Sequence, residues 1–403
     1  MSTLQNPIKN AVLAVNAGSS SLKFALYPKQ NYQVDKACLT GIVEGLEPGG
    51  IPRISVSGDQ GESQRVLSPT TGSSFDHALD ALREVLANHA DSLRIVAIAH
   101  RIVHGGERYA ASIILDDAAQ DYLKSLSNLA PLHQPHNLRG VDAFRRAYPD
   151  LLQIGCFDTG FHATIPVTEQ MFALPQALRA AGIRRYGFHG LSYRYVAGRL
   201  AERSKQADKK VLIAHLGNGA SVCALLDGKS IATSMGFSAL DGLMMGTRSG
   251  AVDPGVLLHL MRQGWDLNKM EHMLYRESGL LGVSGISADM RTLHASDNPD
   301  AAMAINLFTY RLIKESGALT ASLGGLDLLA FTGGIGEHDA AIRLAACEQL
   351  QYLGIKIDTV RNLAATGTHM LPIHAPDSKV EVWVVPTDEG RVAAGDAAQL
   401  YRR

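Results

Sequence analysis

The feature that most constrains the fold of this 403-residue chain is a strand–turn–strand pattern that occurs twice. AVLAV (11–15) leads through NAGSSS into LKFALY, and VLIAH (211–215) leads through LGNGAS into SVCALL. Short apolar runs bounded by Gly- and Ser-rich turns are typical of buried strands. The turn residues Asn16 and Asn218 lie 202 positions apart. The repetition predicts a duplicated α/β fold with a pseudo-twofold relation between two domains.

The other apolar runs alternate with segments of helical period, which also indicates an α/β architecture. The pattern predicts helices over 74–87, 116–129 and 134–147, and strands over 95–99 and 151–157. No Pro- or Ser-rich linker separates the halves, and we place the boundary near residue 150. The expected domains are 1–150 and 151–386, with a terminal helix over about 387–403 that packs back on the first domain.

Charge and cysteine content narrow the function classes. Basic and acidic residues number 38 and 39, so the chain carries no overall electrostatic footprint for nucleic acid or a membrane surface. No apolar run reaches the roughly 20 residues of a membrane span, and the first residues lack the apolar core of a signal peptide. The four cysteines are far apart and form no CxxC pair. We expect a cytoplasmic protein with reduced thiols and small-molecule partners.

Common single motifs are absent: the chain has no GxxxxGK[ST], GxGxxG, HExxH or GxSxG. Three Gly- or Ser-rich turns at strand ends remain, at 16–23, 216–221 and 331–339. Their N–H and hydroxyl donors suit phosphate oxygens, and Lys23 adds a positive charge to the first. One such turn more often merely reverses the chain. Three of them, spread over duplicated domains, favour a nucleotide held between the domains.

Charged residues beside these turns supply candidate chemistry. Arg101 in HRIVHGG and Arg248 in MGTRSG each present a fork that grips a carboxylate or phosphate, although an isolated arginine is more often a surface ion-pair partner. Asp158 follows an apolar strand directly, so its carboxylate is expected at the sheet edge, with a turn or capping role as the alternative. Single histidines such as His133 and His189 are more often structural.

Ten segments occur in a characteristic order: VNAGSSSLKF, AHRIVHGGE, APLHQP, FDTGFH, YGFHGLS, HLGNGAS, MGTRSG, SGISADMR, FTGGIGE and PTDEG. Through them the chain resembles, nearly end to end, the acetate kinase family, which includes propionate and butyrate kinases and belongs to the actin-like sugar-kinase superfamily. The resemblance implies two ribonuclease H-like domains with an interdomain cleft. It also implies Mg²⁺-dependent (alternatively Mn²⁺-dependent) reversible phosphoryl transfer from ATP to acetate, and also to propionate, by a cytoplasmic homodimer that makes acetyl phosphate and ADP.

The resemblance also implies residue roles. The metal site is expected at Asn16 and Glu389, and the phosphate-side residues are Ser19, Ser21 and Lys23. The catalytic residues implied are Asp158, His189, Arg248, Arg101 and His133. The carboxylate is expected to meet Arg101 and a small apolar pocket, formed by Val103, Leu132, Phe188 and Ala239. The nucleotide-binding positions are His215, Leu216, Gly217, Asn218, Gly219, Asp289, Met290, Arg291, Gly334, Ile335, Gly336, Glu337 and His338.

Several positions depart from the family pattern. Tyr193 stands where HGxSH has histidine, and Ala239 stands where GFxPL has proline. Met290 replaces an aromatic residue, His338 replaces asparagine, and PTDEG replaces PTNEE around Glu389. The Ala239 departure bears on the acyl pocket, and which carboxylate is preferred stays open.

Two other functions remain as alternatives. A sugar kinase would need a general base for a hydroxyl and a polar pocket, whereas the matched pocket is small and apolar. A nucleotide-gated binding protein would hydrolyse ATP slowly and make no acyl phosphate. A short carboxylate is already ionised at pH 7 and needs no base, so we expect Asp158 to orient an arginine or a metal-bound water.

Overall fold

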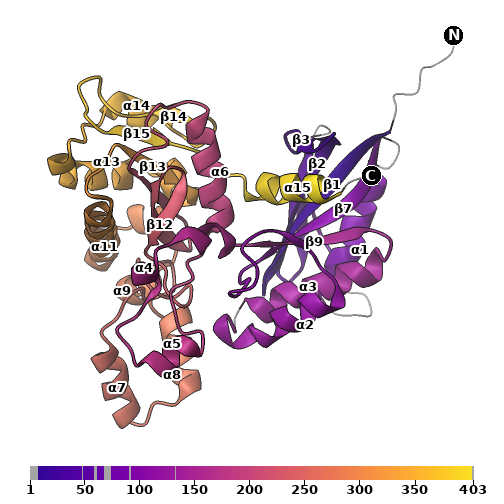
Figure 1. Ribbon diagram of the computed structural model, residues 1–403, viewed down its shortest axis with the longest axis horizontal. Helices are drawn as coiled ribbons and strands as arrows, with labels where there is room; N and C mark the ends of the chain where they lie inside the picture. Colours follow the sequence, from indigo (N-terminus) through magenta and orange to yellow (C-terminus); the bar gives the residue numbers. More distant parts are fainter. Residues whose placement is uncertain are drawn as a thin grey trace. The chain divides into compact units, whose positions relative to one another are not determined.

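The computed structural model describes residues 8–47, 49–58, 61–67, 74–89, 92–131 and 133–401 (Figure 1). The chain divides into two compact units, Met1–Gly160 with Asp388–Arg403 (unit 1) and Phe161–Thr387 (unit 2). The division follows Gly160 rather than the predicted residue 150, because strand β9 (Leu152–Phe157) belongs to the sheet of unit 1.

Unit 1 is built on one mixed sheet with the strand order β6-β5-β4-β2-β1-β7-β9-β8, and β3 pairs with β2. Its further strands are β1 (Lys9–Ala17), β2 (Ser21–Gln30), β3 (Gln33–Val34), β4 (Leu39–Glu44), β5 (Arg53–Gly58), β6 (Gly61–Val66), β7 (Leu93–Ile102) and β8 (Ile113–Ile114). From β6 to β1 neighbouring strands are antiparallel, whereas β1, β7 and β9 run parallel. The carboxyl ends of β1, β7 and β9 therefore meet at one edge.

Helices cover this sheet through apolar faces. Helix α1 (Ser74–Ala87) has the predicted range, and its buried Ala78, Leu82 and Leu86 belong to one core with Leu13 and Val15 of β1. The predicted helix over 116–129 is interrupted: α2 (Asp117–Ser125) is followed by a 3₁₀ turn, Ser127–Leu129. Helix α3 (Gln134–Ala147) follows them.

The last helix, α15 (Glu389–Leu400), also belongs to unit 1 and packs against β1 and β7. Four alanines form its buried face: Ala393, Ala394, Ala397 and Ala398. Small side chains let the helix approach the sheet closely.

Unit 2 repeats the strand order of unit 1. Its sheet runs β12-β11-β10-β13-β15-β14, formed by β10 (Val211–Leu216), β11 (Ala220–Leu226), β12 (Lys229–Thr233), β13 (Leu328–Thr332), β14 (Leu371–Pro372) and β15 (Glu381–Val384). Strands β12, β11 and β10 are antiparallel, and β13 and β15 continue parallel to β10. Strands β4, β2, β1, β7 and β9 of unit 1 have the same order and directions. The predicted duplicated α/β fold is confirmed.

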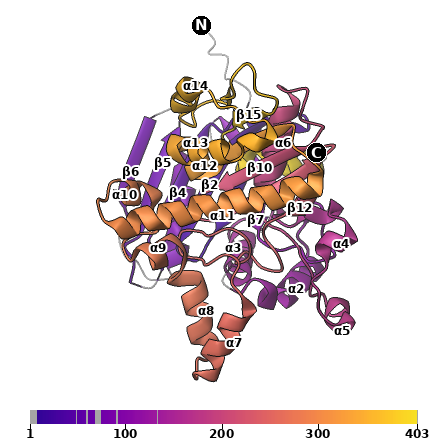
Figure 2. The same ribbon diagram turned by 90° about the vertical axis from the view of Figure 1, so that its left-hand side faces the viewer.

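The helices of unit 2 are α4 (Val167–Gln170), α5 (Gln176–Ala180), α6 (Gly190–Ala201), α7 (Pro254–Arg262), α8 (Leu267–Arg276), α9 (Gly279–Ser284), α10 (Met290–His294), α11 (Pro299–Leu323), α12 (Gly333–His338), α13 (Ala340–Gln349) and α14 (Thr359–Ala364). Helix α11 crosses the sheet and contacts β10, β11 and β12, while α7 and α8 project from the unit (Figure 2). Helix α11 begins at a side-chain cap from Asn298 and ends at Gly324, which has positive φ.

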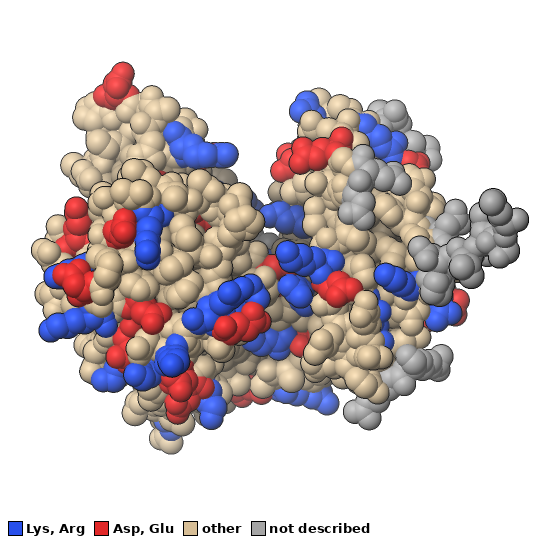
Figure 3. Space-filling view, turned by 90° about the horizontal axis from the view of Figure 1, so that it is seen from above, with Lys and Arg blue, Asp and Glu red and all other residues tan. Residues whose placement is uncertain are grey.

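The surface carries charges of both signs (Figure 3), and the cysteines agree with the prediction of reduced thiols. Basic and acidic side chains are interspersed on the face drawn in Figure 3. No disulfide links the cysteines of the described residues: Cys156, Cys223 and Cys347 are buried, and Cys38 is half-buried. Among the helices of the described residues, none has the length and apolarity that crossing a membrane requires.

Candidate active site

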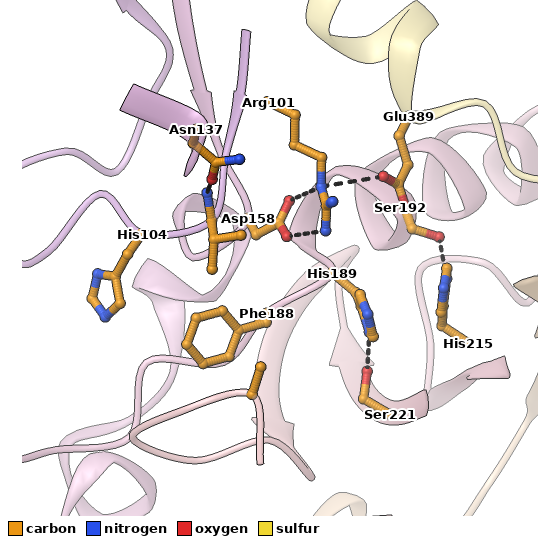
Figure 4. A network of polar contacts seen from close by, with 12 residues as sticks. Arg101, His104, Asn137, Asp158, Phe188, His189, Ser192, His215, Ser221 and Glu389 are labelled. Atoms are coloured by element: carbon orange, nitrogen blue, oxygen red, sulfur yellow. Dashed lines mark hydrogen bonds and ion pairs between the residues drawn. The ribbon is translucent and has the colours of Figure 1, made fainter. Parts of the chain in front are cut away.

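In unit 1, the centre of the candidate site is an arginine held by two carboxylates (Figure 4). Arg101 lies near the end of β7 and donates from Nε to Oδ1 of Asp158 at 3.0 Å and from Nη2 to Oδ2 at 2.6 Å. Glu389, at the start of α15, places Oε2 3.5 Å from Nε. Burial alone would lower the pKa of Arg101, but the charges of Asp158 and Glu389 outweigh it and raise the pKa above its ordinary value. Both oxygens of the buried Asp158 are thus engaged by Arg101.

The ends of the parallel strands are tied together by a side chain of α3. Asn137 Oδ1 accepts a hydrogen bond from the Val103 N–H at 3.0 Å, and its Nδ2 donates to the Ala17 carbonyl at 2.6 Å. Val103 is buried, two residues beyond Arg101. Since Ala17 follows Asn16, Asn137 fixes the Arg101 segment relative to the first Gly/Ser turn. His133 is the residue before α3, and Leu132 lies outside the described residues.

The first turn joins β1 to β2 and presents its polar groups to solvent. The Gly18 N–H donates to the Ser21 carbonyl at 2.8 Å and closes the turn. Ser19 and Lys23 are exposed, and Ser21 begins β2. Hydroxyls and a lysine at a tight turn make a donor-rich surface that suits an anion.

In unit 2, His189 and Arg248 meet at the second Gly-rich turn. His189 has a left-handed backbone (φ 59°), an uncommon conformation for a residue with a side chain, and it precedes α6. A Cβ added to Gly219 would lie 3.3 Å from His189 Nε2 and 2.8 Å from Arg248 Nη2. Arg248 also donates from Nη1 to the Ala239 carbonyl at 2.6 Å. The absence of a side chain at Gly219 therefore leaves room for both donors beside one stretch of backbone.

A second histidine stacks on the first. The rings of His189 and His215 have centroids 4.2 Å apart and planes 25° apart. Nδ1 of His189 lies 2.8 Å from Ser221 Oγ, and Nδ1 of His215 lies 2.8 Å from Ser192 Oγ (Figure 4). Serine hydroxyls therefore hold the Nδ1 atoms of both rings.

His162 supports the turn that carries Phe188 and His189. Its Nε2 lies 2.8 Å from the Phe188 carbonyl, which only accepts, and its Nδ1 lies 2.8 Å from Ser230 Oγ. Burial lowers the pKa of His162 to about 4, so the ring is neutral, with Nε2–H donating and Nδ1 accepting. Phe188, expected in the acyl pocket, is itself buried.

Residues from each of the three segments predicted to bind the nucleotide line one cavity of about 680 Å³ within unit 2. Five of the predicted positions are not in its wall: His215, Leu216, Gly219, Gly336 and Glu337. Its walls come from the turn after β10, the start of α10 and helix α12: Gly217, Asn218, Ala288, Asp289, Met290, Arg291, Gly334, Ile335, His338 and Asp339. A Cβ on Gly334 would meet no atom within 4 Å. Asp289 pairs with Arg291, whose hydrogen bonds lower the pKa of Asp289 to about 2.

Two residues of this region hold the cavity wall in place. Glu337 Oε1 accepts from the N–H groups of Gly333 at 2.9 Å and Thr387 at 3.1 Å, so this carboxylate organises the backbone of the loop. Arg343 is fully buried and donates five hydrogen bonds to the carbonyls of Gly336, Glu337, Asn362 and Ala365 and to the Asn362 side chain. It thereby ties α12 to α14.

The predicted residues are distributed over the two units. Unit 1 carries the predicted metal, phosphate-side and Arg101–Asp158 positions, whereas unit 2 carries His189, Arg248, Phe188, Ala239 and the nucleotide segments. Sequence reasoning missed the supporting residues Asn137, His162, Ser192, Ser221 and Arg343. His162, Ser192 and Ser221 lay within the recognised motifs FDTGFH, YGFHGLS and HLGNGAS, whereas Asn137 and Arg343 have no local signature.

Comparison with known proteins shows the family to which the chain belongs. The sequence profile of the acetokinase family matches residues 11–395. The chain is 47% identical over 391 residues to an acetate kinase of Rhodopseudomonas palustris, covering 96% of this chain and 97% of the relative. It is 43% identical over 397 residues to a propionate kinase of Yersinia enterocolitica, covering 96% and 95%. A crystal structure of a propionate kinase from Francisella tularensis superposes with a TM-score of 0.87 at 35% identity, covering 96% of this chain and 98% of that one. The chain belongs to the acetokinase family.

Proposed function

We propose that the protein is an acetate kinase that transfers the γ-phosphoryl group of ATP reversibly to acetate, and also to propionate, making an acyl phosphate and ADP. The observation that carries the proposal is which guanidinium nitrogens of Arg101 have partners. Among the described residues, Asp158 and Glu389 engage its Nε and Nη2, and no partner engages Nη1. Two carboxylates align Arg101, and its remaining N–H donors can bind the carboxylate group of a small substrate. The buried Val103, two residues further along the chain, suits the apolar tail of such a substrate.

The mechanism that we propose uses no general base. A carboxylate substrate has a pKa near 5 and is an anionic nucleophile at pH 7. The barrier is then lowered by alignment of the two reactants and by neutralisation of charge on the transferring group. Arg101, Arg248 and Lys23 supply donors and positive charge, and His189 supplies a donor. The engagement of both Asp158 oxygens by Arg101 supports an orienting role for this carboxylate.

We assign the nucleotide to the cavity of unit 2. Its volume of about 680 Å³ lies within the range of small-molecule sites. Glycines in its wall at 217 and 334 allow close approach of a ligand to the backbone. Met290 supplies an apolar, adaptable surface that suits a purine ring.

We also propose a Mg²⁺ site at Asn16 and Glu389. Among the described residues, the Asn16 side chain has no hydrogen-bond partner, and Glu389 shares only a long contact with Arg101. An amide oxygen and one carboxylate fit Mg²⁺, which typically takes few protein ligands and completes its shell with waters and phosphates. Asn16 and Glu389 would hold the ion or its waters, and the bound ion would neutralise phosphate charge.

The exposed apolar side chains of unit 2 support a homodimer. Several lie on α7, α8 and α11: Val256, Leu258, Met261, Leu267, Met303 and Tyr310. Where exposed apolar side chains gather into one patch, they mark an interaction surface. We propose that a second copy covers part of it, so Leu258→Glu should lower the mass measured by light scattering, while Arg203→Ala, in the exposed turn after α6, should not. A monomeric parent protein would contradict this assembly.

The test of the activity is to trap the product. ATP, Mg²⁺ and acetate or propionate are supplied, and acyl phosphate is captured with hydroxylamine as a coloured hydroxamate. We expect product with both acids, a large loss in Arg248→Ala and none in Arg203→Ala. If no acid of two to four carbons gives hydroxamate, the proposed function is wrong.

A further inference from the structure

A buried tyrosine stands behind the histidine of the candidate site. Tyr193 lies on α6, one helical turn after His189, and its side chain is fully buried. Its hydroxyl hydrogen-bonds to Ser221 Oγ, and the same Oγ lies 2.8 Å from Nδ1 of His189. Tyrosine occupies this position in place of the histidine of the HGxSH pattern. The three side chains form a continuous line from the core to the imidazole, whose last step is drawn in Figure 4.

The direction of the hydrogen bonds in this line follows from counting protons. Among the described residues, Ser221 Oγ is the one hydrogen-bond partner of the Tyr193 hydroxyl. Burial raises the pKa of this phenol well above its usual value, so the hydroxyl stays protonated and donates a hydrogen bond to Ser221 Oγ. The Ser221 hydroxyl has a single proton, so it donates one hydrogen bond, to its other partner, Nδ1 of His189. Nδ1 therefore accepts, and the neutral ring carries its proton on Nε2.

We propose that Tyr193, acting through Ser221, is a positioning residue that fixes the tautomer of His189 with the proton on Nε2. The inference rests on the proposed function only in assigning a phosphoryl oxygen as the group that His189 meets. No bond to a heavy atom forms or breaks in the relay. Its effect is that Nε2 presents a donor and not a lone pair.

The surroundings of Nε2 favour this assignment. The site of a Cβ on Gly219 lies 3.3 Å from Nε2 and 2.8 Å from Arg248 Nη2, so the two groups border the same space. Two donors that converge on one place suit an anionic oxygen, whereas a lone pair on Nε2 would repel it. The stacked ring of His215 has a matching arrangement, because Ser192 Oγ contacts both its Nδ1 and Thr387 Oγ1, at 2.8 and 3.0 Å.

The tautomer is measured directly by ¹⁵N NMR of histidine-labelled protein, with the His189 signals assigned from their loss in His189→Gln. In the parent protein we expect Nδ1 to have the shift of an unprotonated nitrogen and Nε2 that of a protonated one. Tyr193→Phe keeps the ring and removes the hydroxyl, so the Nδ1–H form should become populated. We expect kcat to fall about three- to tenfold, with the KM values for ATP and carboxylate within twofold.

Tyr195→Phe is the matched control, because Tyr195 lies on the same helix and its hydroxyl makes no hydrogen bond within the described part of the chain. It should change neither the spectrum nor kcat. A proton found on Nδ1 in the parent, or an unchanged His189 spectrum in Tyr193→Phe, overturns the inference. The NMR result is independent of turnover, so it stands or fails separately from the hydroxamate assay.

Discussion

Replacing Asp158 by asparagine tests how the carboxylate of the site works. Asn keeps the shape of the side chain but leaves one acceptor oxygen and places an N–H₂ group where Arg101 now donates. In the structure Asp158 is 1% exposed, and its two hydrogen bonds with Arg101 measure 3.0 and 2.6 Å. Removing one partner of a buried pair costs about 3–5 kcal/mol. Arg101 retains Glu389 at 3.5 Å and has a side chain that is 23% exposed, which lowers the expected cost to about 2–3 kcal/mol.

We assign this cost to the alignment of Arg101 in the transition state, where it corresponds to a loss in kcat/KM of about 30- to 150-fold. The assay is initial-rate acyl phosphate formation with acetate, and Asp117→Asn, which removes an exposed partner of Arg145, is the control with no expected loss. A double-mutant cycle with Arg101→Ala then separates the roles. If Asp158 acts by orienting Arg101, the Asn substitution adds little once the arginine is gone.

Two results would refute this reasoning. Near-normal activity of Asp158→Asn would exclude any catalytic contribution of the carboxylate. A loss that stays equally large in the Arg101→Ala background would show that Asp158 acts on the substrate, a metal-bound water or another group, and not through Arg101.

Three further outcomes follow from the same geometry. Arg248→Ala should lower kcat/KM by an amount that corresponds to about 3 kcal/mol or more of transition-state stabilisation. Arg248→Lys should recover only part of this loss, because a point charge does not replace the two parallel donors of a guanidinium group. A lysine variant with a kcat/KM within twofold of the parent would exclude bidentate binding by Arg248. Propionate should be used within about tenfold of acetate, since one more buried methylene contributes about 0.8 kcal/mol, and Ala239→Pro should lower the propionate-to-acetate ratio. The Ala239 N–H donates no hydrogen bond among the described residues, so proline removes none, and an unchanged ratio would show that this position does not set chain length. Burial lowers the pKa of His162 from 6.5 to about 4, so at a pH between these values the residue takes up a proton on unfolding. Its contribution to the free energy of unfolding is therefore complete above pH 6.5 and falls by about 1 kcal/mol by pH 5.5. In urea unfolding, the difference in this free energy between pH 7.5 and pH 5.5 should be smaller in His162→Gln than in the parent, and unchanged in the exposed control His369→Gln.

Local patterns were enough to predict the elements around the candidate site. Helix α1 has the predicted range, and the turns after β1 and β10 lie where apolar runs end. The three nucleotide segments were implied by the family resemblance, and residues from each of them line one cavity. By contrast β6, GESQRV, is exposed at every residue and has no apolar alternation, so pairing with β5 alone makes it a strand. Its register is a property of the sheet and has no counterpart in the local sequence.

The supporting side chains escaped prediction for a related reason. An arginine in an amphipathic helix is ordinarily a surface residue, and Arg343 is buried only because carbonyls of α12 and α14 converge on it. Ser221 and Tyr193 are 28 positions apart, and neither type signals a hydrogen bond to a distant partner. The boundary between the units lies at Gly160 and not at residue 150. No change in composition marks Gly160, so nothing in the sequence indicates this position.

The membership of α15 in unit 1 has a consequence for how the chain folds during synthesis. Unit 2 is continuous from Phe161 to Thr387, whereas unit 1 needs a segment that leaves the ribosome after the whole of unit 2. When residue 387 has been synthesised, every strand of the unit 2 sheet is present. At that stage β1 and β7 of unit 1 still lack α15, the helix that packs against them. Domains fold as units when their residues have emerged, so the second unit in sequence should become protease-resistant before the first. Glu389, which begins α15, reaches Arg101 only at that final step, so a nascent chain arrested before the last helix should be folded in part yet inactive.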